Sequence, residues 1–344
     1  MVSLSRDEPL GGCACDVTGF YAVSTVQQLI NEGDTMRRLF FSILAVSCLM
    51  VFSTHWASAA VTRDDEEEHN IPTGKGWGER AQPGHQAPRA SRPKGNGNGI
   101  SYHGGPLILG TTNVYYIWYG NWSGNPSATT ILTDFANSIG GSPYFNINTT
   151  YYNGSNTYVS NSVGFSKSTT DNYSKGTALS DANVQTIVSN AISSSALPND
   201  TNGVYFVLTS ADVNETSGFC TQYCGWHTHA AIGVGGSDIK YAFVGNPDRC
   251  PSACEAQSTG PNGNAGADGM ASIIAHELEE AVTDPDLNAW YDSRGYENAD
   301  KCAWTFGTEY TVNGANANMK LGTRDYLIQQ NWVNASGGYC ALSY

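Results

Sequence analysis

The residues best suited to chemistry lie in one short stretch, residues 270–286, which reads MASIIAHELEEAVTDPD. Apolar residues spaced four apart predict a helix with a buried stripe, formed by Met270, Ile274, Leu278 and Val282. His276 and Glu280 are also four apart, so they share one helix face. Imidazole and carboxylate are both ordinary zinc ligands. The spacing therefore predicts that His276 and Glu280 can hold one zinc ion.

Glu277 stands where a zinc hydrolase would need its base. The pattern is that of H-E-x-x-H, with Glu280 in place of the second histidine. A carboxylate in this position can take a proton from a water whose pKa the metal has lowered. We therefore predict Glu277 as the catalytic base.

A third metal ligand is needed, and the sequence offers several. Asp286 follows His276 by ten residues, the offset found in metzincin zinc proteases, and we predict it as the third ligand. Metzincins turn the chain with a glycine where Thr283 stands here, although Pro285 still ends the helix. The competing candidates are Asp284, Glu297, Asp300, His227 and His229. The alternative to a metal site is a solvated acidic helix face.

Composition limits the classes of function. The 344 residues carry a formal net charge of −14, and only 14% are charged. An acidic chain of this kind is not a nucleic-acid binder, which needs basic patches to neutralise phosphates. A hydrophobic content of 40% is enough for a folded core.

The N-terminal part predicts export. Residues 36–59 combine two arginines, an apolar run and an A-x-A site, as a secretory signal peptide does. We interpret residues 1–35 as an extension from a misassigned start, and expect no membrane attachment after cleavage. Residues 60–98 are rich in charge, Pro and Gly, and we predict a disordered linker or a pro-segment there.

Cysteine usage agrees with an exported chain. Six cysteines follow the predicted cleavage site, an even number that predicts three disulfides of open connectivity: Cys220, Cys224, Cys250, Cys254, Cys302 and Cys340. The N-x-S/T sequons are consistent with a glycoprotein.

From residue 100 to 344 the sequence predicts one α/β domain, a mixed sheet with packed helices, possibly of metzincin-like layout. Strands are expected at 113–119, 203–209 and 239–244, and helices at 128–139, 181–193 and 270–284. One or two exposed strands are expected within 144–158.

The chain resembles the EXORDIUM / phosphate-induced protein 1 family. The resemblance rests on ordered motifs between residues 102 and 340, among them YHGGPLILGTTNVYYIWYGNW, FCTQYCGWHTH, YAFVGNPDRCPSAC and PNGNAGADGM. HELEEAVTDP further resembles the divergent members that carry an HExxE motif. The resemblance implies a secreted, apoplastic or cell-wall protein linked to growth, with no established enzymatic activity.

Three functions follow as expectations. The first is a secreted wall protein in growth or nutrient-related signalling, with cell-wall or extracellular components as partners. The second is a secreted zinc-dependent hydrolase, with a peptide as substrate. The third is a carbohydrate-binding protein using exposed aromatic residues such as Trp118, Trp122, Tyr151 and Tyr152.

Overall fold

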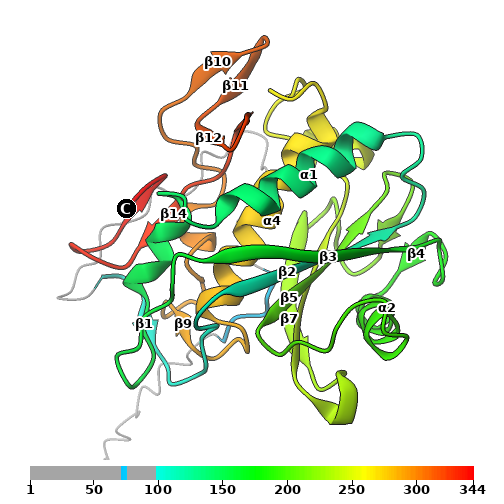
Figure 1. Cartoon of the computed structure of the whole chain (residues 1–344). Coiled ribbons are helices and arrows are strands. Elements are labelled where there is room, and N and C mark those ends of the chain that lie inside the picture. The colour runs from blue at the N-terminus through cyan, green and yellow to red at the C-terminus, as the bar shows by residue number, and fades with distance from the viewer. Residues whose placement is uncertain (1–70, 76–97) are drawn as a thin grey trace, which may run out of the picture. The chain divides into compact units, whose positions relative to one another are not determined.

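The computed structural model describes residues 71–75 and 98–344 (Figure 1). The described residues belong to one compact unit, Arg63–Tyr344. Its centre is a five-stranded sheet in the order β3-β2-β5-β8-β7. The strands are β2 (Thr112–Tyr119), β3 (Val163–Asp171), β5 (Gly203–Thr209), β7 (Gly225–Ala230) and β8 (Ile239–Val244).

The inner strands of this sheet are buried on both faces. All residues of β5 and β8 are buried, which explains their nearly continuous apolar sequences, GVYFVLT and IKYAFV. β3, β2, β5 and β8 run parallel, and β7 alone is antiparallel, pairing His227 with Ala242. β7 is therefore an edge strand whose outer side is open to another segment of chain.

Helices cover both faces of the sheet (Figure 1). α1 (Pro126–Ile139) and α4 (Ala265–Thr283) pack on one face and on each other, and α2 (Asp181–Ser193) packs on the opposite face. Asn264 caps α4 by accepting a hydrogen bond from the Ala267 N–H, and Pro285 prevents its continuation. α4 is thus held between the sheet and the C-terminal part of the chain.

Shorter elements surround this core. Two-residue ladders pair β1 (Ser101–Tyr102) with β9 (Trp290–Tyr291), and β4 (Ala178–Leu179) with β6 (Asn214–Glu215). The C-terminal region adds three antiparallel pairs: β10 (Tyr310–Val312) with β11 (Ala315–Ala317), β12 (Met319–Leu321) with β13 (Arg324–Tyr326), and β14 (Asn331–Val333) with β15 (Tyr339–Ala341). The remaining short helices are η1 (Phe145–Thr150), η2 (Val234–Gly236), η3 (Pro247–Arg249), α3 (Pro251–Cys254) and η4 (Asp300–Cys302).

The six cysteines form three disulfides, as predicted. Two of them run side by side, Cys220–Cys250 and Cys224–Cys254, and join the loop before β7 to α3 and the residue before it. The third, Cys302–Cys340, joins η4 to β15.

The mixed α/β class, the packed helices and the disulfides are confirmed. The expectation for residues 144–158 is wrong, because this segment forms η1 and an isolated bridge between Tyr152 and Tyr158. Phe145, Ile147 and Tyr151 turn inward there, and their burial replaces the expected exposed strands. The domain boundaries stay a prediction, and the signal peptide and the extension before it lie outside the described residues. Among the residues that are described, no helix is both long and apolar enough to cross a membrane.

The aromatic residues suggested for carbohydrate binding do not form an exposed platform. Tyr151 is 0% exposed and donates a hydrogen bond to the Trp332 carbonyl, and Trp118 is 7% exposed. Trp122 and Tyr152 are half-buried against the same core. The expectation that these side chains are exposed is wrong for Trp118 and Tyr151, which strand and helix packing place in the core, whereas Trp122 and Tyr152 keep part of their surface exposed.

Removing the Cys302–Cys340 disulfide is expected to destabilise the domain. It closes a loop across 38 positions, for which the loss of chain entropy in the unfolded state corresponds to about 4 kcal/mol. The double variant Cys302→Ser/Cys340→Ser should therefore unfold at a clearly lower guanidinium concentration than the native chain. An unchanged midpoint would contradict this role.

Candidate metal centre

Helix α4 is buried on every side along its second half. His276 is 2% exposed, and Glu277, Glu279 and Glu280 are 0% exposed. The alternative of a solvated acidic face is therefore wrong, because the sheet covers one side of α4 and the C-terminal segments cover the other. Burying ionisable groups is costly unless they are paired or bind a metal.

His276 and Glu280 lie together, as their spacing predicts, and Asp300 joins them. His276 Nε2 is 3.1 Å from Glu280 Oε1 and 3.6 Å from Asp300 Oδ1. The backbone N–H of Asp300 donates a 3.0 Å hydrogen bond to Glu280 Oε1, which fixes η4 against α4. The other oxygen of Asp300 accepts a hydrogen bond from the Glu297 N–H, so Oδ1 is left facing the imidazole.

A second group lies on the other side of Glu280. His227, on β7, places Nε2 3.7 Å from Glu280 Oε2 and 3.2 Å from Glu297 Oε1. His227 and Glu297 are each 1% exposed. In each group the possible ligand atoms lie within 4.8 Å of one another. Glu280 belongs to both groups, through a different oxygen in each.

Asp286, the predicted third ligand, lies elsewhere. Its Oδ1 is 3.7 Å from His229 Nδ1 and 3.1 Å from Lys240 Nζ, in a half-buried group that also contains Asp238. The chain turns after Asp284, whose Oδ1 accepts 2.6 Å hydrogen bonds from the N–H groups of Asn288 and Ala289. This turn directs Asp286 to the rim of the sheet, whereas Asp300 returns along α4 to His276.

Glu277, the predicted base, is close to both groups but has no partner of its own. Both of its carboxylate oxygens are buried, and neither has a hydrogen-bond partner among the described residues. A Cβ at Gly225 would lie 2.8 Å from Glu277 Oε1 and 2.6 Å from Ile273 Cγ2, so only glycine leaves room there. Glycine at the start of β7 thus provides the space that Glu277 occupies.

The pKa values reflect acidic groups that are buried close together. Burial raises the pKa of Glu277 well above its usual value, and Glu280 and Asp300 raise it further against the opposing effect of His276. Burial, followed by the charges of Glu280, Asp284 and Asp300, raises the pKa of Glu297 in the same way.

The pKa values of His276 and His227 are shifted in opposite directions. Burial acts to lower the pKa of His276, but Glu280 and Asp300 outweigh it, and the pKa lies well above its usual value. Burial lowers the pKa of His227 to about 4, against the opposing charge of Glu280. His227 is therefore a neutral imidazole, the form that binds metals.

The donor set fits a divalent cation such as zinc. Zinc ligands about 2.0–2.1 Å from the ion lie roughly 3.3 Å apart in a tetrahedron. The distances of 3.1 and 3.6 Å around His276, and of 3.2 and 3.7 Å around His227, are of this size. Glu280 Oε2 and Asp300 Oδ1 are buried without a hydrogen-bond partner among the described residues. These oxygens are what a bound cation would satisfy.

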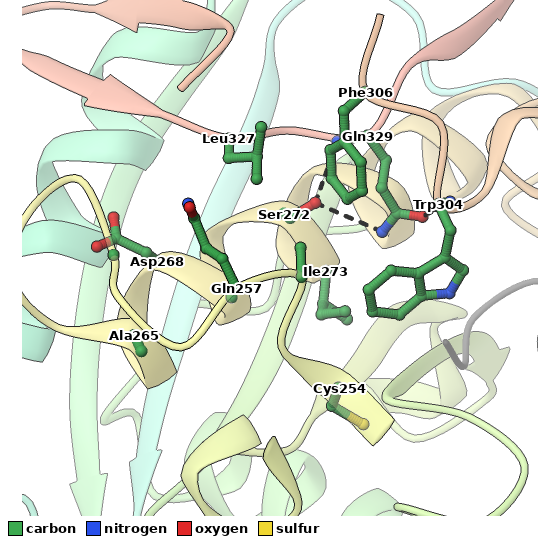
Figure 2. A pocket seen from close by; sticks show the side chains of 13 residues that line it. Cys254, Gln257, Ala265, Asp268, Ser272, Ile273, Trp304, Phe306, Leu327 and Gln329 are labelled. Carbon is green, nitrogen blue, oxygen red and sulfur yellow. Dashed lines mark hydrogen bonds between the residues drawn. The ribbon is translucent and has the colours of Figure 1, made fainter. Parts of the chain in front are cut away.

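A pocket lies one helical turn from Glu277 (Figure 2). Ile273 on α4 and Trp304, four residues after Asp300, are among its lining residues. Figure 2 shows Ser272 and Gln329 in contact on its wall, where the Gln329 N–H donates to Ser272 Oγ at 3.1 Å. The pocket therefore shares α4 with the two histidine groups, and its other lining residues come from residues 254–260 and from the chain after η4.

A short N-terminal segment touches the centre from the edge of the sheet. The carbonyl of Gly74 accepts a 3.1 Å hydrogen bond from the His227 N–H. Lys75 Nζ donates to Asp181 and Ser217 at 2.6 and 2.7 Å, and lies over the Trp226 ring at 5.2 Å. Residues 71–75 thus pair with the outer side of β7 at the position of His227.

Comparison with known proteins decides the family. Residues 100–325 match the family description "Phosphate-induced protein 1 conserved region". This chain belongs to the phosphate-induced protein 1 family. It is 32% identical over 280 residues to Protein EXORDIUM-like 3 of Arabidopsis thaliana, which covers 70% of this chain and 82% of the relative.

Other members of the family match to a similar degree. Protein EXORDIUM-like 5 of Arabidopsis thaliana is 33% identical, covering 68% of this chain and 75% of that protein. Protein PHOSPHATE-INDUCED 1 of Nicotiana tabacum is 30% identical, covering 56% and 67%. No solved structure matches, so the metzincin-like layout stays a prediction. The resemblance noted in the sequence motifs is confirmed.

Sequence spacing alone does not show which of the acidic candidates lies beside His276 in the folded chain. Glu297 and Asp300 were among several acidic candidates, and His227 was one of two in the H-x-H of β7. The signal that points to Asp300 and Glu297 is their position just before Cys302, whose disulfide joins η4 to β15 and restrains this segment.

The chelator-treated protein is expected to lose stability as the pH rises. Burial raises the pKa of Asp284 from 3.8 to about 7, so its stabilising contribution is complete below pH 3.8 and is lost as the pH rises through 7. At about 1.4 kcal/mol per pKa unit, the full contribution of Asp284 is roughly 4 kcal/mol, of which roughly 3 kcal/mol is lost between pH 5 and pH 8. Guanidinium unfolding at pH 5 and pH 8 with chelator measures the difference.

Asp284→Asn is the matched control, because its amide oxygen can still accept the two hydrogen bonds of the turn. This variant should show a smaller loss between the two pH values. A native chain that is equally stable at pH 5 and pH 8 under chelation would contradict the raised pKa.

Proposed function

We propose that the protein is a secreted extracellular protein whose buried centre binds zinc and hydrolyses a peptide bond. The observation that carries the proposal is the grouping of His276, Glu280 and Asp300, with Glu277 beside it. Three disulfides support an oxidising, extracellular setting. The ligands we propose are His276 and Glu280, as the helix spacing predicts, with Asp300 as the third.

Within this proposal each residue has a defined task. A zinc ion held by His276, Glu280 and Asp300 would polarise the substrate carbonyl and make a water more acidic. Glu277 accepts a proton from the attacking water and passes it to the leaving amine. Water and amide are thus converted to a carboxylic acid and an amine. The pocket beside Ile273 and Trp304 offers space for an apolar substrate side chain.

A role in growth or nutrient-related signalling is the second part of the proposal. It is supported by the names of the relatives, EXORDIUM-like 3 and PHOSPHATE-INDUCED 1. Cell-wall or other extracellular components are the proposed partners, and the apoplast or cell wall the proposed location. This role does not depend on hydrolysis, so the two parts can be tested separately.

Zinc content tests the centre. Protein purified without chelator or metal-binding tag should contain zinc, and His276→Ala should lose the ion that His276 binds. Asp286→Asn should keep its zinc, since Asp286 pairs with Lys240, whereas Asp300→Asn should bind zinc more weakly. Loss of zinc in Asp286→Asn alone would instead identify Asp286 as the third ligand.

Glu277→Gln tests hydrolysis. It should retain zinc but lose about 10²–10⁴-fold in the rate of cleavage of a peptide library, the usual contribution of a general base. A zinc-containing native protein that cleaves no peptide would contradict the hydrolase and leave the signalling role.

We further propose that residues 60–98 act as a pro-segment, anchored by residues 71–75 on β7. A methyl group at Gly74 would lie 1.9 Å from the His227 carbonyl oxygen, so Gly74→Ala should detach the segment. We expect hydrogen exchange of the His227 amide to accelerate at least tenfold, as measured by mass spectrometry or NMR. Thr73→Ala is the control, because among the described residues the Thr73 hydroxyl forms hydrogen bonds only with the backbone of Lys75. Unchanged exchange in Gly74→Ala would show that the anchor is not formed.

A further inference from the structure

The two histidine groups around Glu280 are built alike. Each contains one buried imidazole and one carboxylate from the segment before Cys302. His276 has Asp300, and His227 has Glu297. Glu280 completes each group with one oxygen, Oε1 toward His276 and Oε2 toward His227. A carboxylate used in this way can join two metal ions.

We propose that this centre holds two divalent metal ions bridged by Glu280, the second bound by His227 and Glu297. The inference rests on the proposed zinc centre at His276 and extends it by one ion. Two-metal hydrolytic sites keep their ions about 3.5–4 Å apart, a separation that a bridging carboxylate can span.

An orphaned oxygen is the independent sign of the second ion. Glu280 Oε2 is buried, has no hydrogen-bond partner among the described residues, and faces His227 Nε2 at 3.7 Å. A cation between these atoms and Glu297 would satisfy all three. Glu280 Oε1 differs, because it accepts the Asp300 N–H as well as facing His276.

Charge balance also favours two ions. Four buried carboxylates surround the centre, those of Glu277, Glu280, Glu297 and Asp300. In residues 71–75 and 98–344, neither lysine nor arginine forms a salt bridge with any of them. One divalent ion at His276 would leave Glu297 without a cation, and a second ion beside His227 would supply one.

The neighbouring group of His229, Asp238 and Asp286 already has a positive charge and is not proposed as a metal site. Lys240 Nζ lies 3.1 Å from Asp286 Oδ1 and also pairs with Asp238. Its ammonium group supplies the positive charge, and the group is half-exposed to water. It therefore serves as an internal control.

The first test is the number of zinc ions per chain in the full-length protein, measured by mass spectrometry after dialysis. We expect two ions in the native chain, one in Glu297→Gln and Asp300→Asn, and none in Glu280→Gln. The control Asp238→Asn should keep two. One ion in the native chain, unchanged in Glu297→Gln, overturns the second position while the proposed zinc centre stands. No ion in the native chain overturns both.

The second test examines whether Glu280 bridges the two ions, and its main reading comes from the native chain. The protein loaded with Mn²⁺ should give the electron paramagnetic resonance spectrum of two coupled ions, and Glu297→Gln the spectrum of a single ion. Two uncoupled ions in the native chain would overturn the bridge by Glu280. Near-ultraviolet circular dichroism confirms that each variant is folded.

Discussion

The structure depends on how the charges of its buried carboxylates are neutralised, either by protons or by cations. Placing a carboxylate inside a protein costs several kcal/mol even after relaxation. A whole domain is stable by only about 5–15 kcal/mol. The fold can therefore keep Glu277, Glu280, Glu297 and Asp300 together only if they are protonated or bind cations. The raised pKa values of Glu277 and Glu297 describe the first state, and the proposed metal centre is the second.

The rest of the architecture can be understood as holding these groups in place. α4 contributes His276, Glu277 and Glu280 from one rigid element, and His276 and Glu280 share a face because they are one turn apart. β7 brings His227 from the edge of the sheet, and its first residue, Gly225, leaves room for Glu277. The turn fixed by Asp284 starts the chain back along α4, and the Cys302–Cys340 disulfide holds the returning segment.

Much of this could be predicted from local sequence. Strands β5 and β8 match the expected residues, as does helix α2, because continuous apolar runs and regular spacing decide them locally. Ser180 caps α2 by accepting a hydrogen bond from the N–H of Asn183. The pair His276 and Glu280 follows from helix geometry alone.

The remaining parts of the centre depend on tertiary structure, which spacing does not contain. Asp286 was chosen by its distance along the chain, but the turn after α4 carries it to Lys240. Asp300 and Glu297 reach the centre only because the chain doubles back over many residues. Likewise, Tyr151 and Phe145 looked like exposed strand residues, yet they pack into the core beside β14.

The negative charges of the acidic group at the rim and of the acidic group in the interior are compensated in different ways. At the half-exposed rim, Asp238 and Asp286 are neutralised by Lys240, and a flexible side chain is sufficient because water shares the charge. In the interior, the carboxylates face two imidazoles instead, and one of these, His227, has a pKa of about 4 and so carries no charge near neutral pH. Neutral imidazole beside carboxylate oxygens that have no hydrogen-bond partner among the described residues is the donor set on which the proposed metal centre rests, and it distinguishes the interior groups from the ion pair at the rim.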